Sequence, residues 1–172
     1  SRLTERDAWE LHVPLRRRQL LAKAQRAMGF EVTLDPFACA QTHICPRYAC
    51  RFSNPEALCL DGLSLDWRQE DVWINPPWAL LPEIVAKLHL ERPQAVLIVP
   101  EWPSQQWWPS LRALGGTYLP LPRPAMSVHP LHDRVVEPFL HPSTRLVAVL
   151  LPRGTGPSAK ASWAPRSIAA AH

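Results

Sequence analysis

An α/β fold, built on an open and mostly parallel sheet with helices on both faces, is the architecture that this sequence predicts. Segments with helical periodicity alternate along the chain with short, strand-like segments, which is the order typical of such sheets. Residues 95–99 form a continuous apolar run, as expected for a strand that is covered on both faces. The chain is 47% hydrophobic although it holds 20 prolines, so we expect a loop-rich but compact domain.

Three helices are predicted. Residues 15–28 place apolar side chains at helical spacing, and Gly29 follows where a helix commonly ends. Residues 80–90 carry a proline near the first turn, where its missing N–H costs nothing. The third helix is predicted over 104–114, where Pro109 should kink it or divide it into two short pieces.

Six strands are predicted from β-branched and apolar runs that end in turn residues. A long proline-rich connection over 122–142 separates the last two. Residues 1–152 are expected to form one domain, and 153–172, which are small, polar and basic, a flexible tail. The predicted strands are 31–34, 57–60, 72–74, 95–99, 117–121 and 145–151.

Polar residues follow three of these strands. Asp35, Asp61 and Asn75 each stand directly after a strand-like run. In open parallel sheets ligands bind beyond the carboxyl ends of the strands. The sequence therefore predicts that the three side chains meet at one edge of the sheet.

The charge distribution excludes a generic polybasic nucleic-acid binder. The net charge is +4, but residues 153–172 hold three basic side chains and no acidic one. Residues 1–152 therefore carry only one more basic than acidic side chain, which leaves room for a local basic face near the N-terminus.

No part of the sequence is typical of a membrane protein. No apolar run approaches the roughly 20 residues that span a bilayer, and no signal-peptide pattern stands near the start. We expect no membrane partner and an intracellular protein, in the nucleus if the source is eukaryotic and otherwise in the cytoplasm.

Four cysteines and a histidine lie close together in the sequence and raise the question of zinc. Structural zinc sites take four thiolate or imidazole ligands, typically in close pairs two to four residues apart. The spacing here does not match, so small buried thiols are the preferred interpretation and no metal is predicted. The residues are Cys39, His43, Cys45, Cys50 and Cys59.

The segment Asn75-Pro76-Pro77-Trp78, directly after a predicted strand, has the chemistry of a base pocket. Two prolines fix a rigid, non-helical turn. The Asn75 amide oxygen and the Pro76 carbonyl can both accept hydrogen bonds from an exocyclic amino group, while Trp78 offers a flat ring on which an extruded base can stack. The alternative is a turn that ends a strand, with a core tryptophan.

The order and spacing of five segments resemble a known family. They are similar to the phage-type adenine-specific DNA methyltransferases and, more closely, to the methyltransferase-like domain of DIRS-type tyrosine-recombinase retrotransposons. The resemblance covers about residues 9–151. The segments are residues 34–38, 45–48, 61–67, 72–78 and 100–104, the last followed by Trp107.

This resemblance implies a Rossmann-like class I fold that binds S-adenosylmethionine. It places Asn75, Pro76, Pro77 and Trp78 at the target amino group. Asp35 and Phe37 would take the place of the glycine-rich cofactor loop, Asp61 would contact the ribose or adenine of the cofactor, and Trp9 belongs to an entry segment that helps to close over the cofactor. No metal is required.

Arginines in two segments are candidates for contacts with DNA phosphates. Arg47 and Arg51 flank Tyr48 in a predicted loop, and Arg16 and Arg17 begin the first helix. For the helix pair, a solvated helix face is the alternative interpretation.

Three functions follow from these observations. The first is S-adenosylmethionine-dependent methylation of the exocyclic amino group of adenine in DNA, with DNA and other domains of a larger polyprotein or complex as partners. The second is a catalytically inactive descendant that serves as a nucleic-acid-binding or structural module, which the absence of a glycine-rich loop after residue 34 favours. The third is methylation of RNA or of cytosine, since the amino-group pocket treats both bases similarly.

Overall fold

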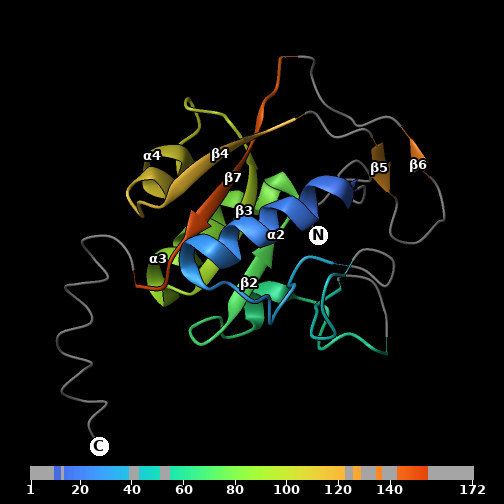
Figure 1. Cartoon of the computed structure of the whole chain (residues 1–172). Coiled ribbons are helices and arrows are strands. Elements are labelled where there is room, and N and C mark those ends of the chain that lie inside the picture. The colour runs from blue at the N-terminus through green and yellow to red at the C-terminus, as the bar shows by residue number, and fades with distance from the viewer. Residues whose placement is uncertain are drawn as a thin grey trace, which may run out of the picture.

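A four-stranded mixed sheet forms the centre of the molecule in a computed structural model (Figure 1). The structure describes residues 10–12, 14–38, 43–50, 55–122, 126–128, 135–136 and 143–154. The strand order is β2-β3-β7-β4, and only β2 and β3 are parallel. These strands are β2 (Asp71–Ile74), β3 (Gln94–Pro100), β4 (Thr117–Leu121) and β7 (Leu146–Leu151).

A second, antiparallel sheet has the order β1-β5-β6. Its strands are β1 (Glu10–His12), β5 (Met126–Val128) and β6 (Val135–Val136). β5 and β6 lie within the proline-rich connection, for which the sequence predicts no strand.

The predicted mostly parallel, Rossmann-like sheet is wrong for this chain. β7 lies between β3 and β4 and runs antiparallel to both, so the sheet has one parallel pair and two antiparallel pairs. The physical reason lies in the connections. A parallel pair needs a crossover, usually a helix, whereas the described part of the connection between β4 and β7 contains no helix and β7 returns in the opposite direction.

Two predicted strands are also absent as strands in the described chain. Residues 31–34 contribute only an isolated parallel bridge between Leu34 and Val72, and a second bridge joins Asp35 to Tyr48. Residues 57–60 form no strand, although the Leu58 N–H donates to the Tyr48 carbonyl at 2.8 Å. Short, polar-flanked segments such as these pair locally without extending the sheet.

The three predicted helices are present. Their bounds are α2 (Pro14–Met28), α3 (Leu81–Glu91) and α4 (Trp107–Arg112). α2 ends at Gly29, whose positive φ of 64° suits a glycine after a helix. α4 begins three residues later than predicted, so that Pro109 lies in its first turn and divides nothing. Two 3-10 turns, η1 (Gly62–Ser64) and η2 (Trp78–Leu80), complete the helical elements.

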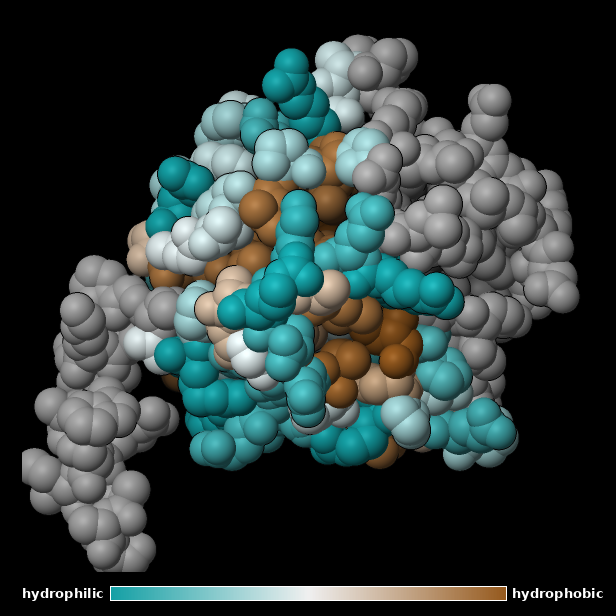
Figure 2. Space-filling model, in the orientation of Figure 1, coloured by the Kyte–Doolittle hydropathy of each residue, from teal (hydrophilic) through white to brown (hydrophobic). Residues whose placement is uncertain are grey.

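The two faces of the sheet bury separate hydrophobic clusters. Alternate β3 residues point to opposite faces: Leu97 packs with α3 and α4, whereas Val96 and Ile98 pack with Leu20 and Ala24 of α2. Figure 2 shows the hydrophilic outer side of α2 lying over this apolar layer. The continuous apolar run in β3 therefore has the predicted cause, which is burial on both sides.

No helix in the described part of the chain is both long enough and apolar enough to cross a membrane. Residues 155–172 of the predicted tail, and most of the connection over 122–142, lie outside the described residues.

Candidate functional site

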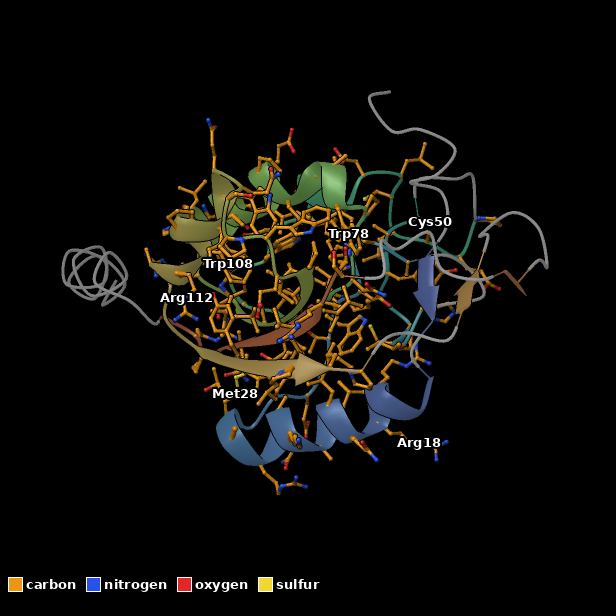
Figure 3. The ribbon with its side chains drawn as sticks, turned by 90° about the horizontal axis from the view of Figure 1, so that it is seen from above. Arg18, Met28, Cys50, Trp78, Trp108 and Arg112 are labelled. Carbon is orange, nitrogen blue, oxygen red and sulfur yellow. The ribbon has the colours of Figure 1, made fainter. Side chains whose placement is uncertain are left out.

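The site is built at the end of β2 and β3, which run side by side in the same direction. Asn75 follows β2 and Glu101 follows β3, so both segments leave the sheet at one edge. Figure 3 looks at the molecule from above and shows Trp78 among the elements at this edge, with α2 on one side of the strands and α3 on the other.

The Asn75–Trp78 segment is a rigid turn. Pro76 is buried, and Pro77 has φ −59° and ψ 132°, the extended conformation from which η2 begins. Asn75 is partly exposed and is engaged in a polar contact. The turn therefore fixes the backbone on which the amide and the Trp78 ring are carried.

The Trp78 ring is held by a second tryptophan. Its centroid lies 5.0 Å from that of Trp102, and the planes meet at 82°, the edge-to-face arrangement that aromatic pairs favour. Trp102 follows β3 as Trp78 follows β2, so the parallel pairing of the strands brings the rings together. Both rings are partly buried against the core between the sheet and α3.

Asp35 is buried at the same edge. The carboxylate is only 2% exposed, and its Oδ2 accepts the Ile44 N–H at 3.0 Å. Burial raises the pKa of Asp35 to about 7, while the Ile44 N–H and the positive charge of Arg17 act in the opposite direction. The side chain therefore fixes the 43–50 segment onto the sheet rather than facing solvent.

Phe37 and Asp61 are brought together by a close contact between their loops. A Cβ atom on Gly62 would lie 2.0 Å from the Pro36 carbonyl oxygen, so only glycine permits this approach. Asp61 itself does not follow a strand. It is exposed, and its Oδ1 accepts the Leu63 N–H at 3.0 Å to cap η1.

Trp67 joins these two loops to α3. This fully buried ring donates its Nε1–H to the Gly62 carbonyl at 3.1 Å and meets the Phe37 ring edge-on at a centroid distance of 6.1 Å. Its backbone N–H donates to Glu91 Oε1 at 2.7 Å, and the ammonium of Lys87 lies 5.0 Å above its ring. Trp67 thereby positions Asp61 and Phe37 without being exposed to a ligand.

The residues at this edge fit S-adenosylmethionine unequally. Asp61 offers an exposed carboxylate that can accept ribose hydroxyls, and Phe37 offers a partly buried ring beside it. Asp35 does not fit the role of a cofactor contact, because it is buried and already accepts the Ile44 N–H. The pair that could hold the cofactor is therefore Phe37 and Asp61.

The Arg47 side chain extends to the other end of the strands. Its guanidinium pairs with Glu70, which precedes β2, and also donates to the Thr33 carbonyl at 3.3 Å. β2 has four residues, so this end is about 13 Å from the turn at Asn75. The structure does not bring Arg47 together with the Asn75–Trp78 segment.

The remaining predicted site residues are placed only in part. Arg17, half-buried in α2, is close enough for its charge to influence Asp35. Trp9, Arg51 and the side chain of Arg16 lie outside the described residues.

The cysteine-rich segment forms no recognisable metal centre within the described residues. Cys45 and Cys50 are buried thiols and Cys59 is partly buried, while Cys39 lies outside the described ranges. Across the described chain, no group of three or more His, Cys, Asp and Glu side chains is arranged to hold a metal ion. The His43 ring instead stacks on Tyr48 with a centroid distance of 4.2 Å.

For two residues of the site, Trp67 and Trp102, the sequence predicts no functional role. Each stands within a segment on which the family resemblance rests, and that position was the available signal. Comparison of the chain with protein-family models, with curated proteins and with solved structures gives no match.

Proposed function

We propose that this protein transfers a methyl group from S-adenosylmethionine to the exocyclic amino group of adenine in DNA. The observation that carries the proposal is the rigid Asn75-Pro76-Pro77-Trp78 turn, directly after β2, with the Trp78 ring held edge-on by Trp102. An amide oxygen, a proline carbonyl and a braced ring at one strand end are the groups that an extruded adenine needs.

Catalysis would consist of positioning and polarisation. When bound, S-adenosylmethionine would supply an electrophilic methyl group, and the C–S bond that breaks would release S-adenosylhomocysteine. Asn75 and the Pro76 carbonyl would accept the two amino hydrogens, which leaves the nitrogen lone pair available as the nucleophile. Trp78 replaces the stacking that the base loses when it leaves the duplex, and the displaced proton passes to solvent.

Transfer of a labelled methyl group from S-adenosylmethionine to duplex DNA tests this proposal. We expect label in N6-methyladenine for the wild type, and a loss of label in Asn75→Ala. Methylation of RNA or of cytosine is tested in parallel reactions. These use RNA, and DNA duplexes in which cytosine carries the only amino groups that can be methylated. Label in cytosine or RNA but not in adenine would contradict the substrate, and no transfer to any nucleic acid would contradict the activity.

A noncatalytic nucleic-acid-binding module is the second candidate, and a specific observation favours it. Asp35, where the family resemblance implies a cofactor contact, is buried and occupied by the Ile44 N–H. Calorimetry with S-adenosylmethionine discriminates between the two candidates. DNA binding without any cofactor binding would support the noncatalytic module, whereas cofactor binding that weakens in Asp61→Ala would support the enzyme.

A further inference from the structure

The outer face of α2 carries positive charge and no negative charge. Arg18, Lys23 and Arg26 are exposed, and the 15-residue helix contains no acidic residue. Figure 3 shows Arg18 directed away from the strands. Leu20 and Ala24 form the opposite, buried face against the sheet, so the orientation of α2 and hence of its cations is fixed by the core.

Four other cations of the described chain are paired with acidic side chains. Arg47, Arg68, Lys87 and Arg153 each form an ion pair with an acidic side chain. None of the ion pairs found among the described residues includes a cation of the exposed α2 face. The positive charge of that face is therefore not neutralised by acidic groups of the described structure.

The spacing of the three cations suits a polyanion. Arg26 lies eight positions after Arg18, a rise of about 12 Å along the helix. Duplex DNA carries one phosphate charge per about 1.7 Å of its axis. The phosphates of a backbone that crosses this face are therefore spaced closely enough to contact each of the three long side chains.

The first turn of α2 lies near the candidate site, because the charge of Arg17 acts on Asp35. We propose that the exposed face of α2, defined by Arg18, Lys23 and Arg26, binds the phosphate backbone of the DNA whose base enters the Asn75–Trp78 site. The choice of DNA as the polyanion rests on the proposed function; the charged surface does not.

The composition of this face favours nucleic acid over an anionic membrane. Besides the three cations, its exposed residues are glutamine and alanine. Helices that lie in a membrane interface bury large apolar side chains beneath their charged face. On α2 the large apolar side chains, such as Leu20, are already packed against the sheet.

The salt dependence of DNA binding tests the proposal. The affinity of the full chain for a labelled duplex is measured by fluorescence anisotropy between about 50 and 200 mM salt, a range over which phosphate contacts change the affinity strongly. The test variant is Arg18→Gln/Lys23→Gln/Arg26→Gln, in which glutamine preserves helix propensity. The control variant, Arg68→Gln/Arg112→Gln/Arg153→Gln, removes the same charge from exposed positions away from α2.

We expect the negative slope of log K against log salt to become shallower by about 2 to 3 in the test variant, since each lost phosphate contact reduces its magnitude by about 0.9. The control should retain the wild-type slope. Circular dichroism verifies that both variants are folded. Equal losses in the two variants would overturn the proposal, as would wild-type binding to phosphatidylserine vesicles without binding to DNA.

The outcomes also separate this inference from the proposed function. A reduced slope in the test variant supports the α2 surface even if no methyl transfer is ever observed. Methyl transfer with an unchanged slope would support the enzyme and refute the surface.

Discussion

The two ends of β2 have opposite chemistry although the strand is only four residues long. At the amino end, charged side chains are paired: Arg47 with Glu70, and Arg153 with Asp71 at 2.9 Å. At the carboxyl end the strand continues directly into an amide, two prolines and the Trp78 ring. Ion pairs therefore stabilise one end of the strand, whereas a rigid turn and aromatic contacts determine the structure of the other.

The amino end joins several segments through its carboxylates. Asp71 Oδ2 accepts the Glu31 N–H at 2.9 Å and the Gln94 side-chain amide at 3.2 Å. These bonds tie the segment before Leu34, the start of β3 and the end of β7 to one point. The polar groups at this end form hydrogen bonds and ion pairs with one another, so we assign this end a structural role.

The largest expected effect is at the carboxyl end. Asn75→Ala should lower the rate of methyl transfer by roughly two to three powers of ten, as for loss of a preorganised transition-state contact. Glu70→Gln, at the amino end of the same strand, is the matched control and should leave the rate unchanged. Single-turnover transfer of labelled methyl groups measures both, and similar rates in the two variants would refute the assignment of the ends.

Asp35 is an exception to the contrast between the two ends, because it is a buried carboxylate at the carboxyl end. Its pKa of about 7 lies above the ordinary value of 3.8, so between these values the folded state binds more protons than the unfolded state. Its contribution to stability is therefore fully present below about pH 4 and is lost as the pH rises to about 7, with a slope of up to about 1.4 kcal/mol per pH unit.

Asp35→Asn keeps an oxygen that can accept the Ile44 N–H but removes the titration. We expect the variant to gain stability relative to the wild type as the pH rises from about 4 to 7. Urea denaturation across this range measures the free energy of unfolding of both proteins. A difference that does not change with pH would show that the carboxylate titrates normally.

Gly62→Ala tests the loop contact that builds the carboxyl end. The new Cβ would meet the Pro36 carbonyl oxygen at 2.0 Å, and overpacking of this kind costs about 1–3 kcal/mol. The loops bearing Phe37 and Asp61 should separate, so affinity for S-adenosylmethionine should fall as well. Denaturation and calorimetry on the same sample measure the two effects.

Gly29→Ala provides the comparison for that variant. Gly29 has a positive φ but no atom within 4 Å of a built Cβ, so its substitution costs only backbone strain of about 1–2 kcal/mol. It should leave cofactor affinity unchanged. Equal affinity in the Gly62 and Gly29 variants would mean that the Pro36 contact does not organise the cofactor site.

The sequence predicted those parts of the fold that depend on local signals. β2, α3 and β3 follow one another as predicted, because apolar runs bounded by turn residues specify each of them. The position of β7 between β3 and β4 could not be predicted in this way. It depends on pairing between segments far apart in the sequence, and the apolar pattern of β7 is the same in either direction.

The candidate site shows the same division. The rigid turn at Asn75–Trp78 follows from two adjacent prolines. The burial of Asp35 depends on Ile44, and the direction of Arg47 depends on Glu70, which is 23 positions away. Such contacts are set by tertiary packing, so residue type and spacing predicted the candidates but not their surroundings.

The smallest expected effect is at the amino end. The Arg47 side chain is 54% exposed, and ion pairs with an exposed partner contribute about 1 kcal/mol or less because solvent and salt screen them. A double-mutant cycle with Arg47→Gln and Glu70→Gln isolates the pair from the bond that Arg47 makes to Thr33. We expect a coupling below about 1 kcal/mol that shrinks further in about 1 M salt, with methyl transfer and DNA affinity unaffected by Glu70→Gln.

A coupling of more than about 2 kcal/mol would contradict the screened pair. Loss of methyl transfer in Glu70→Gln would show that the charged end belongs to the functional site, and the contrast between the two ends of β2 would no longer hold.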